Sequence, residues 1–177
     1  MALKLMCSVD EGRAGVDPWE LVARESIRDL VARYNANGDS GRFDQVLECF
    51  APSATMEMDG LVYRGQAEIR TIFTNAAEVA KQWPEPLGMR HFTSTLQIDL
   101  TSPDEASSRC YYQVLTTHGL DHWGRYLDNY KVIGGNWRFS RRREFLDGCA
   151  PGSWAASAMK SHPGRPAAAG PLVTRDN

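Results

Sequence analysis

Three residues of the sequence, Tyr34, Asp39 and His91, are of types that can take part in proton transfer. A neutral imidazole is a usable base near pH 7, and a carboxylate on its other nitrogen fixes the tautomer and stabilises the imidazolium. A phenol can donate a hydrogen bond to a leaving group or to an enolate oxygen. Such groups could drive loss of water, double-bond migration or an aldol-type ring closure. None of these reactions requires a metal, a nicotinamide or another cofactor.

Each of the three residues also has a purely structural interpretation. Asp39 precedes a predicted helix and is a good N-cap residue for it. His91 shares its alternation with Thr93, and on a regular strand both would lie on the more polar face. A β-bulge near Thr93 or Ser94 would reverse this phase. Tyr34 has the spacing of an apolar helix face, which is typical of a core tyrosine with a satisfied hydroxyl.

Other potentially reactive residues give weaker patterns. His118, Asp121 and His122 cluster around Gly119 and invite a metal-binding interpretation. Metal sites need several convergent, oriented ligands, and this cluster falls in a predicted exposed turn, so we expect no metal. The four cysteines lie far apart without zinc spacing, so we expect them to be reduced and unpaired. The sequence contains neither a Gly-rich phosphate loop nor a Gly-x-Ser-x-Gly motif.

The elements that would position these residues change from helices to long strands along the chain. A first helix is predicted from Pro18 to Asn37-Gly38, because apolar residues recur at three- and four-residue steps. Asp59-Gly60 between two short apolar runs predicts a hairpin. Strands that follow helices favour an α+β fold, in which three helices on one curved antiparallel sheet enclose a cone with a pocket at its open end. The other elements are predicted as helices over 39–50 and 66–81 and strands over 89–100, 107–118, 122–133 and 136–146.

The length and composition are those of one globular domain. We assign residues 1–17 to a loose leader, 18–148 to the domain and 149–177 to a tail rich in Ala, Gly and Pro. The formal net charge of −2 gives no electrostatic reason to expect nucleic acid or an anionic membrane as partner. The one basic cluster, Arg141-Arg142-Arg143, is interpreted as the solvated end of a strand.

Targeting and assembly are inferred from the same features. No stretch approaches the ~18 apolar residues of a spanning helix. The N-terminus has no full signal-peptide core, so we expect a cytoplasmic protein. The long predicted strands provide an extended surface suited to a homodimer or homotrimer.

Several short motifs, taken in order, resemble the SnoaL-like branch of the nuclear transport factor 2-like superfamily over roughly residues 19–147. The resemblance implies a single cone-shaped α+β domain with about three N-terminal helices on a strongly curved, mostly antiparallel sheet. The motifs are Ile27–Tyr34, Asp39–Asp44, Cys49–Ala54, Tyr63–Gly65, Arg90–Thr93, Gly124–Tyr126 and Asn136–Phe139.

The resemblance also implies roles for the candidate residues. Within this superfamily, bile acid 7α-dehydratase, scytalone dehydratase and hexachlorocyclohexane dehydrochlorinase use an Asp after the first helix and a His at the start of a long strand. Asp39 and His91 match these positions, and Tyr34 matches a tyrosine five residues before the Asp of the bile acid enzyme. His91 would then be the general base, Asp39 its orienting partner and Tyr34 a supporting donor. The usual third partner is missing, because residues 111–114 include neither His nor Asp.

The function implied is that of a cofactor-independent lyase or isomerase of dehydratase, isomerase or cyclase type. Its substrate would be a small hydrophobic molecule of alicyclic, polycyclic or polyketide-like structure. The alternative is a non-catalytic binding or assembly module, such as a ligand carrier or the small subunit of a ring-hydroxylating dioxygenase. The candidate pocket residues are Phe92, Tyr111, Tyr126 and Tyr130. For the three tyrosines the simplest interpretation is cross-strand packing.

Overall fold

The structure is a computed structural model that describes residues 15–58 and 60–160. Four helices and six strands make up this part of the chain. The helices are α1 (Pro18–Asp39), α2 (Phe43–Glu48), α3 (Gly65–Lys81) and α4 (Trp154–Lys160). The strands are β1 (Phe50–Met58), β2 (Leu61–Arg64), β3 (Arg90–Ser102), β4 (Glu105–Thr116), β5 (Gly119–Ile133) and β6 (Asn136–Cys149).

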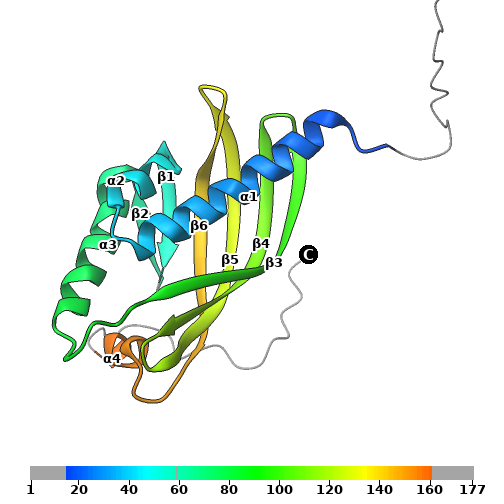
Figure 1. Cartoon of the computed structure of the whole chain (residues 1–177). Coiled ribbons are helices and arrows are strands. Elements are labelled where there is room, and N and C mark those ends of the chain that lie inside the picture. The colour runs from blue at the N-terminus through cyan, green and yellow to red at the C-terminus, as the bar shows by residue number, and fades with distance from the viewer. Residues whose placement is uncertain (1–14, 59, 161–177) are drawn as a thin grey trace, which may run out of the picture.

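All six strands form one sheet in the order β2-β1-β6-β5-β4-β3. Strands β3 to β6 follow one another as antiparallel neighbours, whereas β1 pairs with β6 in parallel. The parallel pair arises because α3 carries the chain away from the short β1–β2 hairpin to β3 at the opposite edge. The long strands curve, and α1 crosses the face that they enclose (Figure 1). The fold is therefore α+β with helices on a curved, mostly antiparallel sheet, as predicted.

Helix α1 packs on the sheet through one apolar face. Ile27, Leu30, Val31 and Tyr34 are buried and recur at three- or four-residue steps, so they share one side of the helix. This side contacts β3 and β6. The main core lies between it and the sheet and includes Phe139. Burial of this face fixes the direction in which the C-terminal end of α1 points.

The predicted elements agree with the structure in order and type, with shifts of a few residues at most of their ends, and three of the differences matter for the site. The hairpin is confirmed by the antiparallel pair of β1 and β2, with Met58 opposite Leu61. Helix α1 continues through Gly38 to Asp39, and the left-handed glycine that follows it is Gly41, with φ of 69°. The interpretation of Asp39 as an N-cap is wrong, because α2 begins only at Phe43 and its N-cap residue is Arg42.

The other two differences lie around β5 and α4. Strand β5 begins at Gly119, three residues before the predicted start, so Asp121 belongs to a strand rather than to the predicted turn. Residues 154–160, which were assigned to the tail, form α4 beside the start of β5. Most of the predicted leader and the rest of the tail lie outside the described residues. Within the described part of the chain, no helix is both long and apolar enough to cross a membrane.

Candidate active site

Asp39 and His91 meet through two hydrogen bonds. Nδ1 of His91 lies 2.6 Å from Oδ1 of Asp39, and the backbone N–H of His91 donates to Oδ2 of Asp39 at 2.9 Å. The side chain of Asp39 is 9% exposed and that of His91 is 25% exposed. A carboxylate can only accept, so the neutral ring must carry its proton on Nδ1, which leaves Nε2 as the basic nitrogen.

A β-bulge in β3 places His91 on the inner face of the sheet. Ser94 pairs with Tyr111 and Gln97 with Arg109, so one extra residue lies on β3 between the two pairs. Thr95 in this segment has a positive φ of 54°. His91 consequently lies opposite Val114, which is fully buried. The bulge considered near Thr93 or Ser94 is thus present, one residue further along the strand.

Tyr34 lies in the main core. Its ring makes edge contacts with Phe50, Phe73 and Phe139 at centroid distances of 5.8, 6.0 and 5.7 Å. The guanidinium of Arg142 lies 4.1 Å from its ring centroid. Burial raises the pKa of Tyr34, so the hydroxyl stays protonated well beyond neutral pH. These contacts are those of a core tyrosine, and none of them is with Asp39 or His91.

The other four candidate residues divide between the two faces of the sheet. Tyr126 and Tyr130 are buried on the inner face, where the Tyr130 hydroxyl lies 2.7 Å from Ser108 Oγ and donates to Asp128 at 3.2 Å. Burial raises the pKa of both tyrosines. Phe92 and Tyr111 are 50% and 51% exposed. They lie on the outer face, because their immediate neighbours His91 and Tyr112 point inward.

Arg142 is a buried cation that the sequence interpretation did not identify. Its side chain is fully buried and donates to both oxygens of Asp128, at 2.9 and 2.8 Å. Its guanidinium also lies 4.2 Å from the ring centroids of Tyr126 and Phe139. Burial lowers the pKa of Arg142, but the charge and hydrogen bonds of Asp128 outweigh this and raise it. The interpretation as a solvated cluster holds for exposed Arg141 and is wrong for Arg142.

A second carboxylate–imidazole pair lies on the inner face. Nδ1 of His122 is 2.8 Å from Oδ2 of Asp121, and the two residues are only 8% and 3% exposed. His122 pairs with Val114 on one side of β4, and His91 pairs with Val114 on the other. The two imidazole centroids are 6.4 Å apart, with the rings nearly perpendicular at 85°. The prediction of an exposed turn was therefore wrong for Asp121 and His122, although His118 is exposed.

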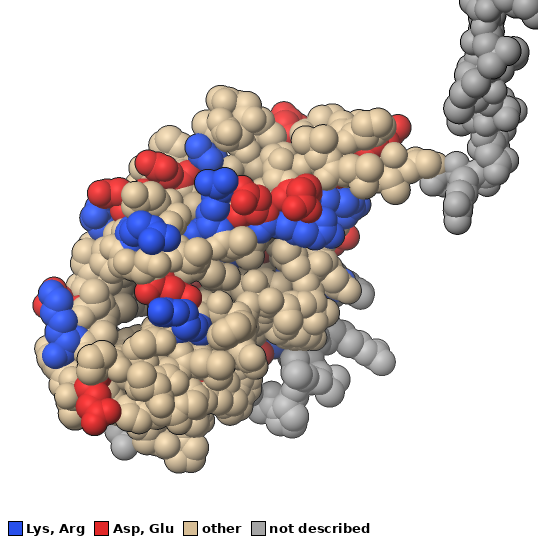
Figure 2. All heavy atoms as spheres, in the orientation of Figure 1, with Lys and Arg blue, Asp and Glu red and all other residues tan. Residues whose placement is uncertain are grey.

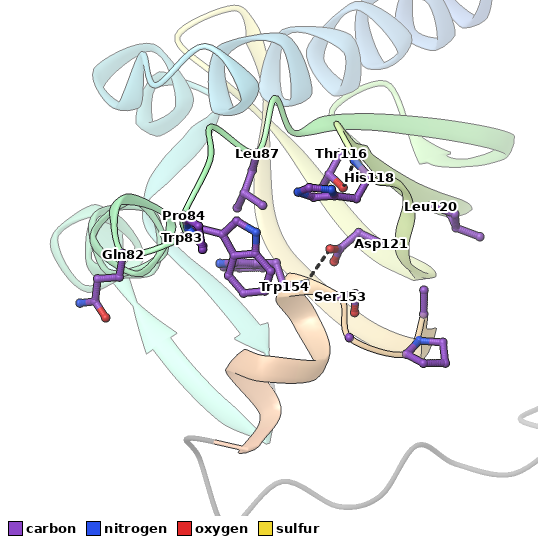
Figure 3. Close-up of a pocket in the computed structure, with 13 residues that line it drawn as sticks. Gln82, Trp83, Pro84, Leu87, Thr116, His118, Leu120, Asp121, Ser153 and Trp154 are labelled. Carbon is purple, nitrogen blue, oxygen red and sulfur yellow. Dashed lines mark hydrogen bonds between the residues drawn. The ribbon is translucent and has the colours of Figure 1, made fainter.

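A pocket of about 580 Å³ opens beside this second pair. It lies between the segment that follows α3, the turn between β4 and β5, and α4 (Figure 3). Trp83, Leu87, His118, Asp121 and Trp154 are among the lining residues. Neither His91 nor His122 is among them, but the His122 ring lies 6.2 Å from that of the lining residue Trp154. Figure 2 shows mixed charges along α1 and a largely uncharged surface around the lower end of the molecule, where α4 lies.

Comparisons with known proteins agree with this architecture. The Mycobacterium tuberculosis protein Rv3472, of unknown function, is 25% identical with a TM-score of 0.70, over 84% of this chain and 91% of that one. Hexachlorocyclohexane dehydrochlorinase LinA-type3 from Novosphingobium barchaimii is 18% identical with a TM-score of 0.65, over 77% and 94%. A Nostoc punctiforme protein of unknown function with a cystatin-like fold is 22% identical with a TM-score of 0.65, over 73% and 95%.

Sequence comparisons identify the family of the chain. A search of curated proteins finds no match to this chain. The family model described as the SnoaL-like domain matches residues 19–143, which include α1 to β5 and the first half of β6. With this match over more than half of its length, the chain belongs to the SnoaL-like domain family.

Proposed function

We propose that the protein is a cofactor-independent lyase or isomerase that uses the Asp39–His91 pair for general acid–base catalysis on a small hydrophobic, cyclic substrate. The observation that carries this proposal is the double hydrogen bond between Asp39 and His91, with Nδ1 at 2.6 Å from the carboxylate. The same fold in a dehydrochlorinase is consistent with such chemistry. A fold alone does not assign a reaction, so the proposal depends on the site.

The proposed catalytic step is removal of a proton from a substrate carbon by Nε2 of His91. As the ring becomes positively charged, the carboxylate of Asp39 stabilises the imidazolium without itself taking the proton. The double contact of Asp39 also fixes the orientation of the ring, because the backbone and side chain of His91 are held by one carboxylate. A positioned base of this kind contributes typically ~10²–10⁴-fold to a rate.

The pocket supports a small and largely apolar substrate. Its volume of about 580 Å³ falls in the usual range for small-molecule sites. Trp83, Leu87 and Trp154 supply apolar surface, and His118 and Asp121 supply polar groups that could orient a ligand. In Figure 3, Leu87 points toward the two tryptophans, whereas Leu120 points away from them.

The experiment that tests this proposal uses 5-nitro-1,2-benzisoxazole as a probe. Removal of the proton from the carbon beside its ring nitrogen breaks the N–O bond and releases a coloured cyanophenolate. We expect the wild-type protein to accelerate this ring opening and His91→Gln to reduce the acceleration by about a hundredfold. Glu25→Ala is the control, because the side chain of Glu25 is exposed on α1 and should have no effect.

Absence of any acceleration by the wild-type protein would contradict the proposed function. If the same protein nevertheless bound the probe, the alternative of a ligand carrier would be favoured. Acceleration that survives in His91→Gln would show that the base is another residue.

A further inference from the structure

The pair Asp121–His122 repeats the contact between imidazole and carboxylate that Asp39 and His91 make, but its two residues are neighbours in the chain. In both pairs Nδ1 of the imidazole lies within hydrogen-bond distance of an aspartate, at 2.8 Å for His122 and 2.6 Å for His91. Both histidines project from the inner face, from strands that flank β4. The chain therefore places two oriented imidazoles side by side at one end of the cone.

The position of His122 beside His91 favours a role in chemistry. The two imidazole centroids are 6.4 Å apart, so one small molecule can contact both rings. Asp121, which holds the His122 ring, lines the pocket, and so does Trp154, whose ring lies 6.2 Å from that of His122. The ring of Tyr112 lies 5.9 Å from that of His122, and its hydroxyl donates to Glu144.

We propose that His122 is a second catalytic residue, which acts as general acid while His91 acts as general base. This inference rests on the proposed function. In the step, Nε2 of His91 takes a proton from a substrate carbon, and the electron pair of that C–H bond forms a new π bond. The bond to the leaving group breaks with its electron pair, and the His122 imidazolium gives its proton to the leaving group. A proton transfer from the His91 imidazolium to His122, directly or through water, then restores both rings.

Electrostatics favours this division of roles. Like charges whose centres are about as far apart as the two rings, at 6.4 Å, repel each other, so a step in which one ring gains a proton while the other loses one avoids this repulsion. Each ring has its own carboxylate, Asp39 or Asp121, and Glu144 faces the same region through Tyr112.

A structural role of this pair must be separated from the catalytic one. Asp121 also accepts hydrogen bonds from the backbone N–H groups of Trp154, at 2.8 Å, and Ala155, at 3.2 Å. It therefore holds the start of α4 against β5 as well as the His122 ring (Figure 3). A variant of His122 could lower turnover only by disturbing this wall of the pocket. Such a disturbance would affect all substrates of one shape by similar factors.

The test compares two probes of nearly the same shape that differ in their leaving groups. The phenolate released from unsubstituted 1,2-benzisoxazole is a poorer leaving group than the nitrophenolate from 5-nitro-1,2-benzisoxazole, so it depends more on a general acid. We expect His122→Gln to lower turnover of the unsubstituted probe at least about tenfold more than that of the nitro probe. His91→Gln should lower turnover of both, and Glu25→Ala should change neither.

The outcomes separate the two proposals. The role of His122 would be overturned if His122→Gln lowered turnover of both probes equally, or of neither. If His91→Gln still lowered turnover, the proposed function would remain intact. No loss with His91→Gln would contradict the proposed function itself.

A second measurement does not require that the His122 variant folds. In the wild-type protein, the imidazole carbon NMR signals of His122 should shift when the cyanophenol product of the probe binds, because the ring would contact the leaving-group oxygen. A His122 signal that the bound product leaves unchanged would overturn the proposal.

Discussion

Both carboxylate oxygens of Asp39 accept hydrogen bonds from the same residue, one from the ring and one from the backbone of His91. This double contact distinguishes the pair from an incidental surface contact, since it fixes the strand as well as the imidazole. Hydrogen bonds to a charged group contribute about 1.5–3 kcal/mol each. Asp39 therefore joins the end of α1 to the start of β3 and orients the proposed base at the same time.

Tyr34 offers a test at the residue scale, because the sequence and the structure suggest different roles for it. Tyr34→Phe keeps the ring that packs against Phe139 and Arg142 and removes only the hydroxyl. We expect turnover of the nitrobenzisoxazole probe to stay within about threefold of wild type, because the hydroxyl lies in the core. Tyr34→Ala should lower the free energy of unfolding by about 3–5 kcal/mol. A large loss of turnover in a stably folded Tyr34→Phe would restore the predicted role as a supporting donor.

At the scale of the element, the bulge in β3 determines whether His91 faces the interior. One extra residue between Ser94 and Gln97 shifts the alternation, so that His91 and Ile98 both point inward. Without it, either His91 or the apolar half of the strand would face solvent. This single bulge thus allows one strand to place Ile98 in the core and His91 in the candidate site.

Deletion of Thr95 tests this dependence. Because side chains alternate with period two, the shortened strand must turn His91 outward if Ile98 stays in the core. We expect the deletion variant to fold and to lose acceleration of the probe to the level of His91→Gln. Thr95→Gly, which suits the positive φ of 54° better than Thr, is the matched control and should retain activity. Full activity in the deletion variant would show that the bulge does not position the base.

The sequence predicted the order and type of the main elements well, because their periodicity and turn residues are local signals. The contact between Asp39 and His91 was expected from the motifs around them rather than from alternation, which favoured the polar face for His91. Their catalytic role stays a prediction. His122 had a detectable signal, since the inward series of Tyr126, Asp128 and Tyr130 extends back to it in steps of two. The turn residue Gly119 concealed this continuation.

Burial of Arg142 could not be predicted in the same way. A run of three arginines is usually solvated, and its middle member is buried here only because Asp128 lies opposite it on β5. That register depends on the pairing of whole strands, including the shift between Asn129 and Tyr130. A local pattern in β6 contains no information about this partner.

At the scale of the whole molecule, the outer face of the sheet exposes large side chains. Phe92, Tyr111 and Trp123 are 50%, 51% and 37% exposed. Phe92 and Trp123 both pair with Gln113, and Tyr111 lies two residues from Gln113 on the same strand, so the three form one patch. No described helix covers this face. Exposed apolar patches of this kind commonly mark sites of association.

We propose that copies of the chain associate through this patch as a homodimer or homotrimer. Phe92→Asp combined with Tyr111→Asp should convert the assembly to monomers, because it would bury unpaired charges in the interface. Val79→Asp on α3, at a position 39% exposed, is the matched control and should leave the assembly intact. Sedimentation velocity measures the masses. A monomeric wild-type protein, or an assembly that persists in the double variant, would contradict the proposal.

The central claim is that Asp39 holds His91 with its proton on Nδ1, which leaves Nε2 as the base. Nitrogen NMR of the neutral His91 ring measures this directly, since the two ring nitrogens have distinct signals. The account predicts a protonated Nδ1 and an unprotonated Nε2 in the wild-type protein, and loss of this preference in Asp39→Asn. A neutral His91 that carries its proton on Nε2 in the wild-type protein would contradict it.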